Sequence, residues 1–289
     1  MDPRIADLMK LVELERLELN LFRGQSRDIG SPQVFGGQVL GQALTAASST
    51  VDGRIVHSLH AYFLRRGDFN APIVYQVDRS RDGGSFSSRR VVAVQFGEPI
   101  FTMAASFQIV ESGLDHQVEM PAVPPPEVLE DAMYYGRKYL AHLPERVQKR
   151  FETAMPFEFR FVEMPGFVNT EKRPPLAHVW FKAVDRVPSD DESLHRCLLA
   201  YVSDYNLLSA AVLPHGIPLF DARLVTASID HGMWFHRPVR VDEWLLYVTE
   251  SPSASGARGF TCGNIFTRDG RLVASTAQEG LIRLVEPKA

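Results

Sequence analysis

Apolar and polar residues alternate along much of this chain, and alternation with a period of two is the pattern of a half-buried β-strand. Turn signals such as Asp82-Gly83-Gly84 and Asp269-Gly270 separate several of the alternating or apolar runs. The strands predicted in this way are residues 16–21, 73–78, 91–96, 100–110, 157–161 and 179–184.

Other segments have the composition or spacing of helices. Asp2-Pro3 is a good helix start and predicts a short helix to about Leu14. Residues 38–49 are rich in Ala, Leu and Gln with few charges, which predicts a helix buried nearly all round. Gly37 and Gly41, four residues apart, would let that helix lie close to a sheet.

Two further segments are predicted to be helical, one before the second half of the chain and one within it. Residues 127–151 are polar and amphipathic and predict an outer helix. Residues 190–211 predict a mostly helical segment that is interrupted near Ser203-Asp204. The stretch between the two halves, ending in the sequence PAVPPP at 121–126, has the composition of an extended linker.

The chain contains a weak internal repeat. Residues 54–109 match residues 226–281 at an offset of 172, with a register slip of three between the glycines and the last strand. Two copies are too few for a solenoid, so they indicate a duplicated α+β domain, each half a sheet wrapped round one central helix. We expect a first repeat at 1–110, a linker and outer helix at 111–152, and a second repeat at 153–289.

Composition narrows the class of protein. The 289 residues are 45% hydrophobic and 23% charged, which is ordinary for a globular chain. The net charge of −4 argues against a general nucleic-acid binder. Cys197 and Cys262 form no CxxC pair, so neither a zinc site nor a disulfide framework is indicated. The N-terminus is too charged for a signal peptide and no apolar run approaches the ~18 residues of a membrane span, so we expect a cytoplasmic protein.

Six blocks in order along the chain resemble the acyl-CoA thioesterase II family: GGQVLGQAL (36–44), VHSLHAYFLRRGD (56–68), SFSSRRVVAVQ (85–95), SDYNLLSA (203–210), SIDHGMWFHRP (228–238) and STAQEG (275–280). The resemblance implies the double hotdog fold, with two tandem repeats that each wrap an antiparallel sheet round a helix. It also implies hydrolysis of fatty acyl-CoA, of medium to long chain, to free fatty acid and coenzyme A. No cofactor or metal is implied, and family members usually associate as homodimers or homotetramers.

The same resemblance implies a catalytic group of Asp204, Ser228 and Gln278, which we call the polar trio. Many family members carry Thr at the hydroxyl position, and Ser keeps the hydroxyl but lacks the methyl that restrains its rotamer. We expect Asp204 to activate water for direct attack, with Ser228 and Gln278 holding the water and the carboxylate. The oxyanion would be met by backbone N–H groups at the start of the helix after Asp204.

Each of these residues also has a structural interpretation. On spacing alone, Asp204 is an N-cap for a helix from Tyr205 to Leu213, and Ser228 and Gln278 are solvent-facing strand residues. The internal repeat adds one observation. Asp204 falls opposite Gly36 at an offset of 168, and Gln278 falls opposite Ser106 at 172, so the first repeat is expected to lack both polar groups and to form one wall of the substrate cleft.

Substrate binding is expected from basic residues in the matching blocks. We predict that His57, Arg65, Arg89 and Arg237 contact substrate, and the wider set of candidates for the phosphates of coenzyme A adds Arg66, Arg90, Arg240 and Arg258. The histidines at 57, 60, 231 and 236 have no clear third ligand beside them, so we expect structural hydrogen bonding and no metal site.

Two other functions fit parts of the sequence. Hydratases of this fold carry Asp-x-Asn-Pro-x-His, and here Leu207 and Ser209 follow Asn206 where Pro and His would be. The missing His removes the second acid–base group. A non-catalytic acyl-CoA binding or sensing module would keep the cleft but has no need to keep the polar trio together.

Overall fold

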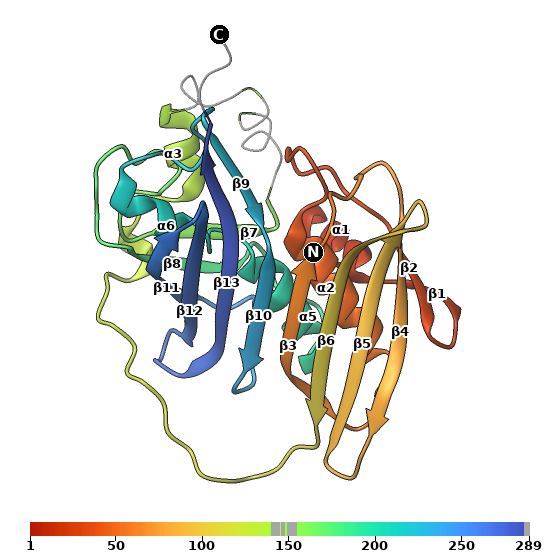
Figure 1. Cartoon of the computed structure of the whole chain (residues 1–289). Helices are drawn as coiled ribbons and strands as arrows, with labels where there is room; N and C mark the ends of the chain where they lie inside the picture. Colours follow the sequence, from red (N-terminus) through yellow and green to blue (C-terminus); the bar gives the residue numbers. More distant parts are fainter. Residues whose placement is uncertain (140–144, 146–147, 149–154, 286–289) are drawn as a thin grey trace.

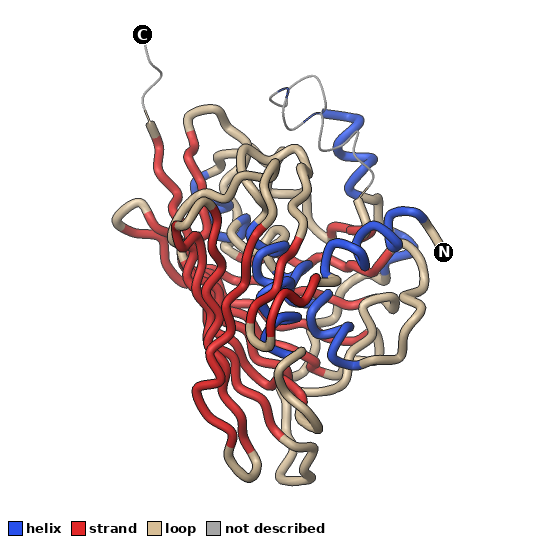
Figure 2. Tube along the Cα trace, turned by 90° about the vertical axis from the view of Figure 1, so that its right-hand side faces the viewer, coloured by secondary structure: helices blue, strands red, loops and turns tan. Residues whose placement is uncertain are grey.

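The computed structural model describes residues 1–139, 145, 148 and 155–285. It is an α+β structure in which 13 strands of the described residues form one continuous antiparallel sheet. The helices lie on one side of this curved sheet (Figure 2). The predicted fold class is therefore confirmed.

The strands of the two halves meet edge to edge. The sheet order is β1-β2-β4-β5-β6-β3-β10-β13-β12-β11-β8-β7, and β9 pairs with β13. The strands of residues 15–108 thus occupy one half and those of residues 157–284 the other, joined by the antiparallel pair β3–β10 (Figure 1). The strands are β1 Glu15–Glu18, β2 Leu21–Gly24, β3 Ile55–Phe63, β4 Ile73–Asp82, β5 Phe86–Gln95, β6 Glu98–Gln108, β7 Phe157–Phe161, β8 Leu176–Ala183, β9 Leu224–Ser228, β10 Asp230–Phe235, β11 Leu245–Ser255, β12 Arg258–Thr267 and β13 Leu272–Leu284.

The described helices are few, and two of them are central to the fold. Helix α2 is buried nearly all round, as predicted, and α5 packs against it in the opposite direction. None of the described helices is long and apolar enough to cross a membrane. The helices are α1 Pro3–Val12, α2 Gly36–Ser48, α3 Ala132–Tyr139, α5 Glu192–Ser203 and α6 Ser209–Val212, with short 3-10 turns η1 Pro126–Val128 and η3 Leu213–His215.

The two glycines of α2 were predicted to bring the helix close to a sheet. In the structure they pack against helix α5 instead. A Cβ atom on Gly37 would collide with the carbonyl oxygen of Tyr201, and one on Gly41 would lie 3.1 Å from the carbonyl oxygen of Cys197. Both partners belong to α5. The glycines therefore let the central helices of the two repeats touch through their backbones.

The prediction of one half-buried strand at residues 16–21 is wrong. The chain turns at residues 19–20, and β1 and β2 form a short antiparallel hairpin at the edge of the sheet. Leu17 and Leu19 are 42% and 62% exposed. Alternation alone cannot distinguish a covered strand from an edge strand whose outer side has no partner.

The segments around the linker agree with prediction only in part. Residues 109–125 contain no helix or strand and run as a long connection between the halves (Figure 1). The outer helix predicted at 127–151 is represented by η1 and α3, and most of its second half lies outside the described residues. The interruption predicted within residues 190–211 is confirmed, because α5 ends at Ser203 and α6 begins at Ser209. The repeat boundaries themselves stay a prediction.

The structure corrects the internal alignment of the repeats. Asp204 follows the last residue of α5, and the corresponding position after α2 is Ser49, whereas Gly36 begins α2. Ser106 is bonded through its Oγ to His57 Nε2, 2.8 Å away, and its buried neighbour is Ala105. The first repeat thus carries Ser49 and Ala105 where the second carries Asp204 and Gln278.

Candidate active site

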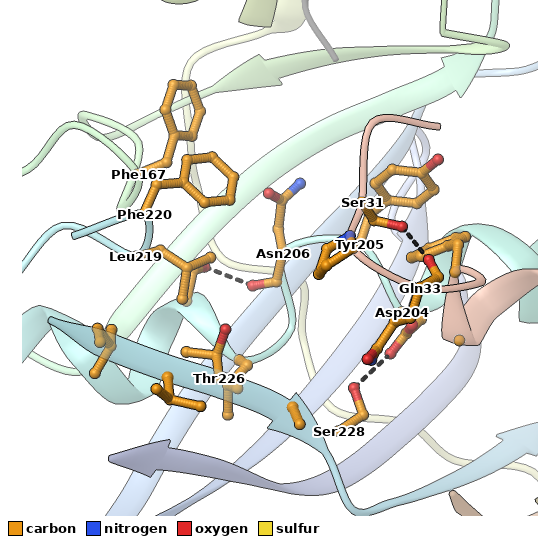
Figure 3. Close-up of a pocket in the computed structure, with 18 of the residues that line it drawn as sticks. Ser31, Gln33, Phe167, Asp204, Tyr205, Asn206, Leu219, Phe220, Thr226 and Ser228 are labelled. Atoms are coloured by element: carbon orange, nitrogen blue, oxygen red, sulfur yellow. Dashed lines mark hydrogen bonds between the residues drawn. The ribbon is translucent and has the colours of Figure 1, made fainter. Parts of the chain in front are cut away.

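The structure brings the polar trio together in one hydrogen-bonded chain. Ser228 Oγ donates to Asp204 Oδ1 over 3.3 Å, and Gln278 Nε2 donates to Ser228 Oγ over 2.8 Å. Asp204 follows α5, Ser228 ends β9, and Gln278 lies within β13. Figure 3 shows Asp204 and Ser228 pointing toward each other at one end of a pocket.

A break in the sheet makes this meeting possible. Strand β13 pairs with β10 as far as Ala277 and with β9 from Gly280 onward. Opposite the break, the Glu279 N–H donates to Asp230 Oδ1 over 2.7 Å, and the Ile229 N–H donates to the Glu279 carbonyl over 2.9 Å. Irregularities of this kind re-aim side chains next to active sites. Here the break leaves Gln278 directed at Ser228.

The start of α2 forms the opposite wall of the site. A Cβ atom on Gly36 would lie only 2.7 Å from Asp204 Oδ2 and 3.0 Å from the Phe63 ring. Phe35 precedes the helix and supplies no side-chain cap to the amides of the first turn. A helix N-terminus without such a cap presents N–H groups and partial positive charge to whatever faces it. The first repeat thus places backbone donors beside the carboxylate of the second.

The prediction that Asp204 begins a helix, whose first backbone N–H groups would face the oxyanion, is wrong. Asp204 is the C-cap of α5 and not an N-cap, and the next helix, α6, begins only at Ser209. Between them Asn206 has a φ of 63°, so the chain turns sharply and does not continue as a helix. The helix terminus that faces Asp204 comes instead from α2, which sequence spacing could not reveal.

A cavity of about 430 Å³ opens beside the polar trio. Most of its wall comes from residues 30–36 of the first repeat and from residues 204–228 of the second, and Gly166, Phe167 and Gln278 complete it. Arg66 is the basic side chain among the described residues that line it. Apolar side chains lie toward the far end (Figure 3). They include Phe167 and Phe220, whose ring centroids are 5.9 Å apart.

A second, smaller cavity of about 170 Å³ adjoins the first. The two share Gly166, Asn206 and Ser209 in their walls. Most of the other side chains that line the second cavity are apolar. They include Phe161, Met164, Pro165, Leu176, Val179 and Leu213.

His231 is in contact with the polar trio from inside the protein. It is fully buried, and its Nδ1 lies 2.8 Å from Gln278 Oε1 while its Nε2 lies 3.0 Å from Ser203 Oγ. Burial lowers the pKa of His231 to about 4, so the imidazole is neutral at neutral pH. Its contacts agree with the structural hydrogen bonding expected for this histidine.

The four predicted substrate-binding residues are not among the described residues that line the two cavities. Burial, followed by the charge of Arg196, lowers the pKa of His57, which bonds Ser106 on the sheet. Arg89 is only 2% exposed. The arginine contacts are Arg65 with the Pro99 carbonyl and Glu98, Arg89 with Thr50 and Asp82, and Arg237 with the Leu272 carbonyl and Asp115. These positions lend no support to a role in binding substrate.

The described residues contain no group of three or more His, Cys, Asp or Glu side chains that could hold a metal ion.

Arg66, which does line the larger cavity, appeared only in the wider set of basic candidates. It follows Arg65 directly, and nothing in the local pattern distinguished the two. Gly36 opens the first matching block, but its position beside Asp204 depends on contact between the repeats.

Comparison with known proteins gives matches over nearly the whole chain. Residues 147–281 match the family model described as acyl-CoA thioesterase, and residues 23–108 match that of the acyl-CoA thioesterase N-terminal domain. "Acyl-CoA thioesterase 2" of Haemophilus influenzae is 42% identical over 97% of this chain and 98% of its own length. The chain belongs to the acyl-CoA thioesterase family.

Further relatives agree in sequence, and solved structures agree in fold. "Acyl-coenzyme A thioesterase 8" of Homo sapiens is 41% identical over 98% of this chain and 91% of that protein. The crystal structure of an acyl-CoA thioesterase II from Mycobacterium marinum has a TM-score of 0.78 and 44% identity, covering 96% of this chain and 99% of that one. A hotdog-fold protein of Alicyclobacillus acidocaldarius, only 19% identical, has a TM-score of 0.79 over 97% of this chain and 99% of its own. The predicted hotdog architecture is thus confirmed.

Proposed function

We propose that this thioesterase hydrolyses fatty acyl-CoA by direct attack of a water molecule that Asp204 activates. One observation carries the proposal: the polar trio forms a continuous hydrogen-bonded chain that opens on a cavity facing the start of α2. The products are a free fatty acid and coenzyme A.

Asp204 is the base in this proposal. Its Oδ1 accepts a hydrogen bond from the Ser228 hydroxyl, while Oδ2 lies toward Gly36 and the cavity. A water bound to Asp204 would pass a proton to the carboxylate as its oxygen bonds to the thioester carbonyl carbon. General-base assistance of this kind contributes roughly 10²–10⁴ in rate.

Ser228 and Gln278 hold the carboxylate in place. The Ser228 hydroxyl donates its one hydrogen bond to Asp204 and accepts a hydrogen bond from the Gln278 amide. Because the hydroxyl is engaged on both sides, its role in the proposal is to orient Asp204 and the water. No histidine base contacts Ser228 among the described residues, which further favours water as the nucleophile.

The negative charge that develops on the carbonyl oxygen is assigned to the first-turn amides of α2. Gly36 lacks a Cβ, so the Asp204 carboxylate lies close to the start of α2, and a helix N-terminus stabilises an anion. The other product leaves as a thiolate. A simple thiol has a pKa of about 8.5, so no strong general acid is required for its departure.

The two cavities support an assignment of the substrate's parts. Arg66, exposed at the wall of the larger cavity, is positioned to meet phosphates of coenzyme A. The adjoining apolar cavity is suited to the acyl chain, in keeping with a medium to long fatty acyl group. Cytoplasmic localisation and assembly into a homodimer or homotetramer stay predictions.

The test is free-thiol release from a panel of acyl-CoAs of increasing chain length. We expect hydrolysis by the wild type and a fall of about 10² or more in kcat for Asp204→Asn. Asp78→Asn, an exposed change on β4, is the matched control and keeps the wild-type rate. Equal rates for wild type and Asp204→Asn would remove Asp204 from the mechanism. Binding of acyl-CoA without hydrolysis by either would identify a sensing module.

A further inference from the structure

A buried histidine extends the hydrogen-bonded chain of the polar trio inward. His231 lies in β10, three residues beyond the end of β9, and has no exposed surface. The full chain runs from Ser203 through His231, Gln278 and Ser228 to Asp204, with contacts of 3.0, 2.8, 2.8 and 3.3 Å. Only the last three residues belong to the proposed catalytic group.

The carboxylate at the end of this chain fixes the direction of the hydrogen bonds from Asp204 as far as His231. An ionised carboxylate only accepts, so the Ser228 hydroxyl must donate to Asp204. Ser228 Oγ then accepts from Gln278, which requires the amide NH2 of Gln278 to face Ser228 and its Oε1 to face His231. An amide oxygen also only accepts, and His231 must therefore carry its proton on Nδ1.

The opposite arrangement is disfavoured at the Asp204 end of the chain. If the Gln278 amide were turned over, Ser228 would donate to Gln278 and would present a lone pair to the Asp204 carboxylate. The amide NH2 would then face Nδ1, so His231 would have to carry its proton on Nε2, beside Ser203 Oγ. In the observed direction Nε2 is bare, and the Ser203 hydroxyl, which lies 3.0 Å from Nε2 and 2.9 Å from the Ala200 carbonyl oxygen, donates its one proton to one of these two acceptors. A proton on Nδ1 thus holds the amide of Gln278 in the orientation that serves Asp204.

We propose that His231 is a positioning residue, which fixes the amide of Gln278 and, through Ser228, the hydrogen bond that Asp204 receives. The inference rests on the proposed catalytic role of the polar trio. His231 does not touch the cavity wall and moves no proton in the reaction. Because it is neutral at ordinary assay pH, it acts as a constant donor.

Kinetics of paired variants test this role. His231→Leu removes the donor, and we expect kcat to fall about tenfold, the rate equivalent of one good hydrogen bond, with KM nearly unchanged. His231→Asn should recover most of the rate, because its amide N–H takes the place of Nδ1–H. In the Gln278→Ala background, His231→Leu should cost nothing further. Additive losses in the double variant would overturn the proposal, since a purely structural role does not depend on Gln278.

The exposed His236 offers a matched control. Its Nε2 bonds Ser275 Oγ over 2.9 Å, and none of the hydrogen bonds described for the polar trio involves it, so His236→Leu should keep the wild-type kcat. Thermal unfolding of every variant separates loss of folded enzyme from loss of rate. If Gln278→Ala itself keeps full activity, the proposed catalytic group fails. If Gln278→Ala is impaired and His231→Leu is not, only the inference about His231 fails.

A measurement on the wild type completes the test without any substitution in the enzyme under study. Nitrogen-15 NMR of the histidine side chains, with His231 assigned from the spectrum of His231→Asn, reports which ring nitrogen carries the proton. We expect a protonated Nδ1 and a bare Nε2. A proton found on Nε2 would overturn the proposal, because Gln278 would then have to present its NH2 to His231.

Discussion

Replacing Gly36 with Ala places one methyl group between the start of α2 and the Asp204 carboxylate. The new Cβ would lie 2.7 Å from Asp204 Oδ2, where ordinary contact begins at 3.4 Å, so the carboxylate must move by about 0.7 Å. Oδ2 is the end of a short, rotatable side chain and can yield, but only by leaving its alignment with Ser228 and the water. A misplacement of about 1 Å can cost on the order of 10²-fold in rate. We therefore expect kcat for Gly36→Ala to fall by about 10- to 100-fold.

The stability of this variant should change little. Alanine favours helix over glycine by up to about 1 kcal/mol, which offsets the crowding of Phe63. Gly41→Ala is the matched control, because its Cβ meets the α5 backbone at Cys197, 3.1 Å away and outside the site. That variant should lose stability and keep kcat. Thiol-release kinetics and urea unfolding of both proteins decide the matter, and a Gly36→Ala enzyme with wild-type kcat would refute the reasoning.

Three further predictions follow from the cavities and from His231. Arg66→Ala should raise KM for acyl-CoA about tenfold with little change in kcat. The same substitution should leave KM unchanged for an acyl-pantetheine, which lacks the nucleotide phosphates. Equal effects on the KM of both substrates would exclude a phosphate contact. Leu213→Trp should fill the smaller cavity and lower kcat/KM for long acyl chains while short chains are hydrolysed as before, which the acyl-CoA panel measures. The pKa of His231, about 4, is below its ordinary value of about 6.5, so the unfolded chain binds a proton first as pH falls. The free energy of unfolding should therefore decrease between about pH 6.5 and 4, by up to about 3 kcal/mol, and this decrease should be smaller in His231→Asn when both are unfolded in urea.

The sequence predicted best what local pattern and the family resemblance determine. A buried helix was predicted at 38–49 and is observed at Gly36–Ser48. The break after Ser203 and the association of the polar trio were also predicted and are present in the structure. The trio could be named only from the resemblance, since Ser228 and Gln278 look like ordinary strand residues. Ser228 and Gln278 come close to each other because the sheet is interrupted at Ile229, and no pattern of residues in the sequence predicts this interruption.

What could not be predicted depends on contacts between the repeats. Asp204 fits either end of a helix by residue type, and only the packing of α2 against α5 shows which helix terminus it faces. Arg65 and Arg66 are adjacent and chemically alike, yet Arg65 pairs with Glu98 while Arg66 lines the cavity. Leu17 and Leu19 follow the pattern of buried residues but lie on an edge hairpin. In each case a distant part of the chain decides the outcome.

The central claim is that water attacks the thioester directly, and a single turnover in ¹⁸O-labelled water tests it most directly. Enzyme in excess over acyl-CoA is quenched within one turnover, and mass spectrometry is applied to the fatty acid and to the protein. Direct attack by water predicts one ¹⁸O atom in the fatty acid, none in Asp204, and no acyl adduct on the protein at any time. An acyl group on Ser228, or ¹⁸O in the Asp204 carboxylate with an unlabelled first product, would contradict it.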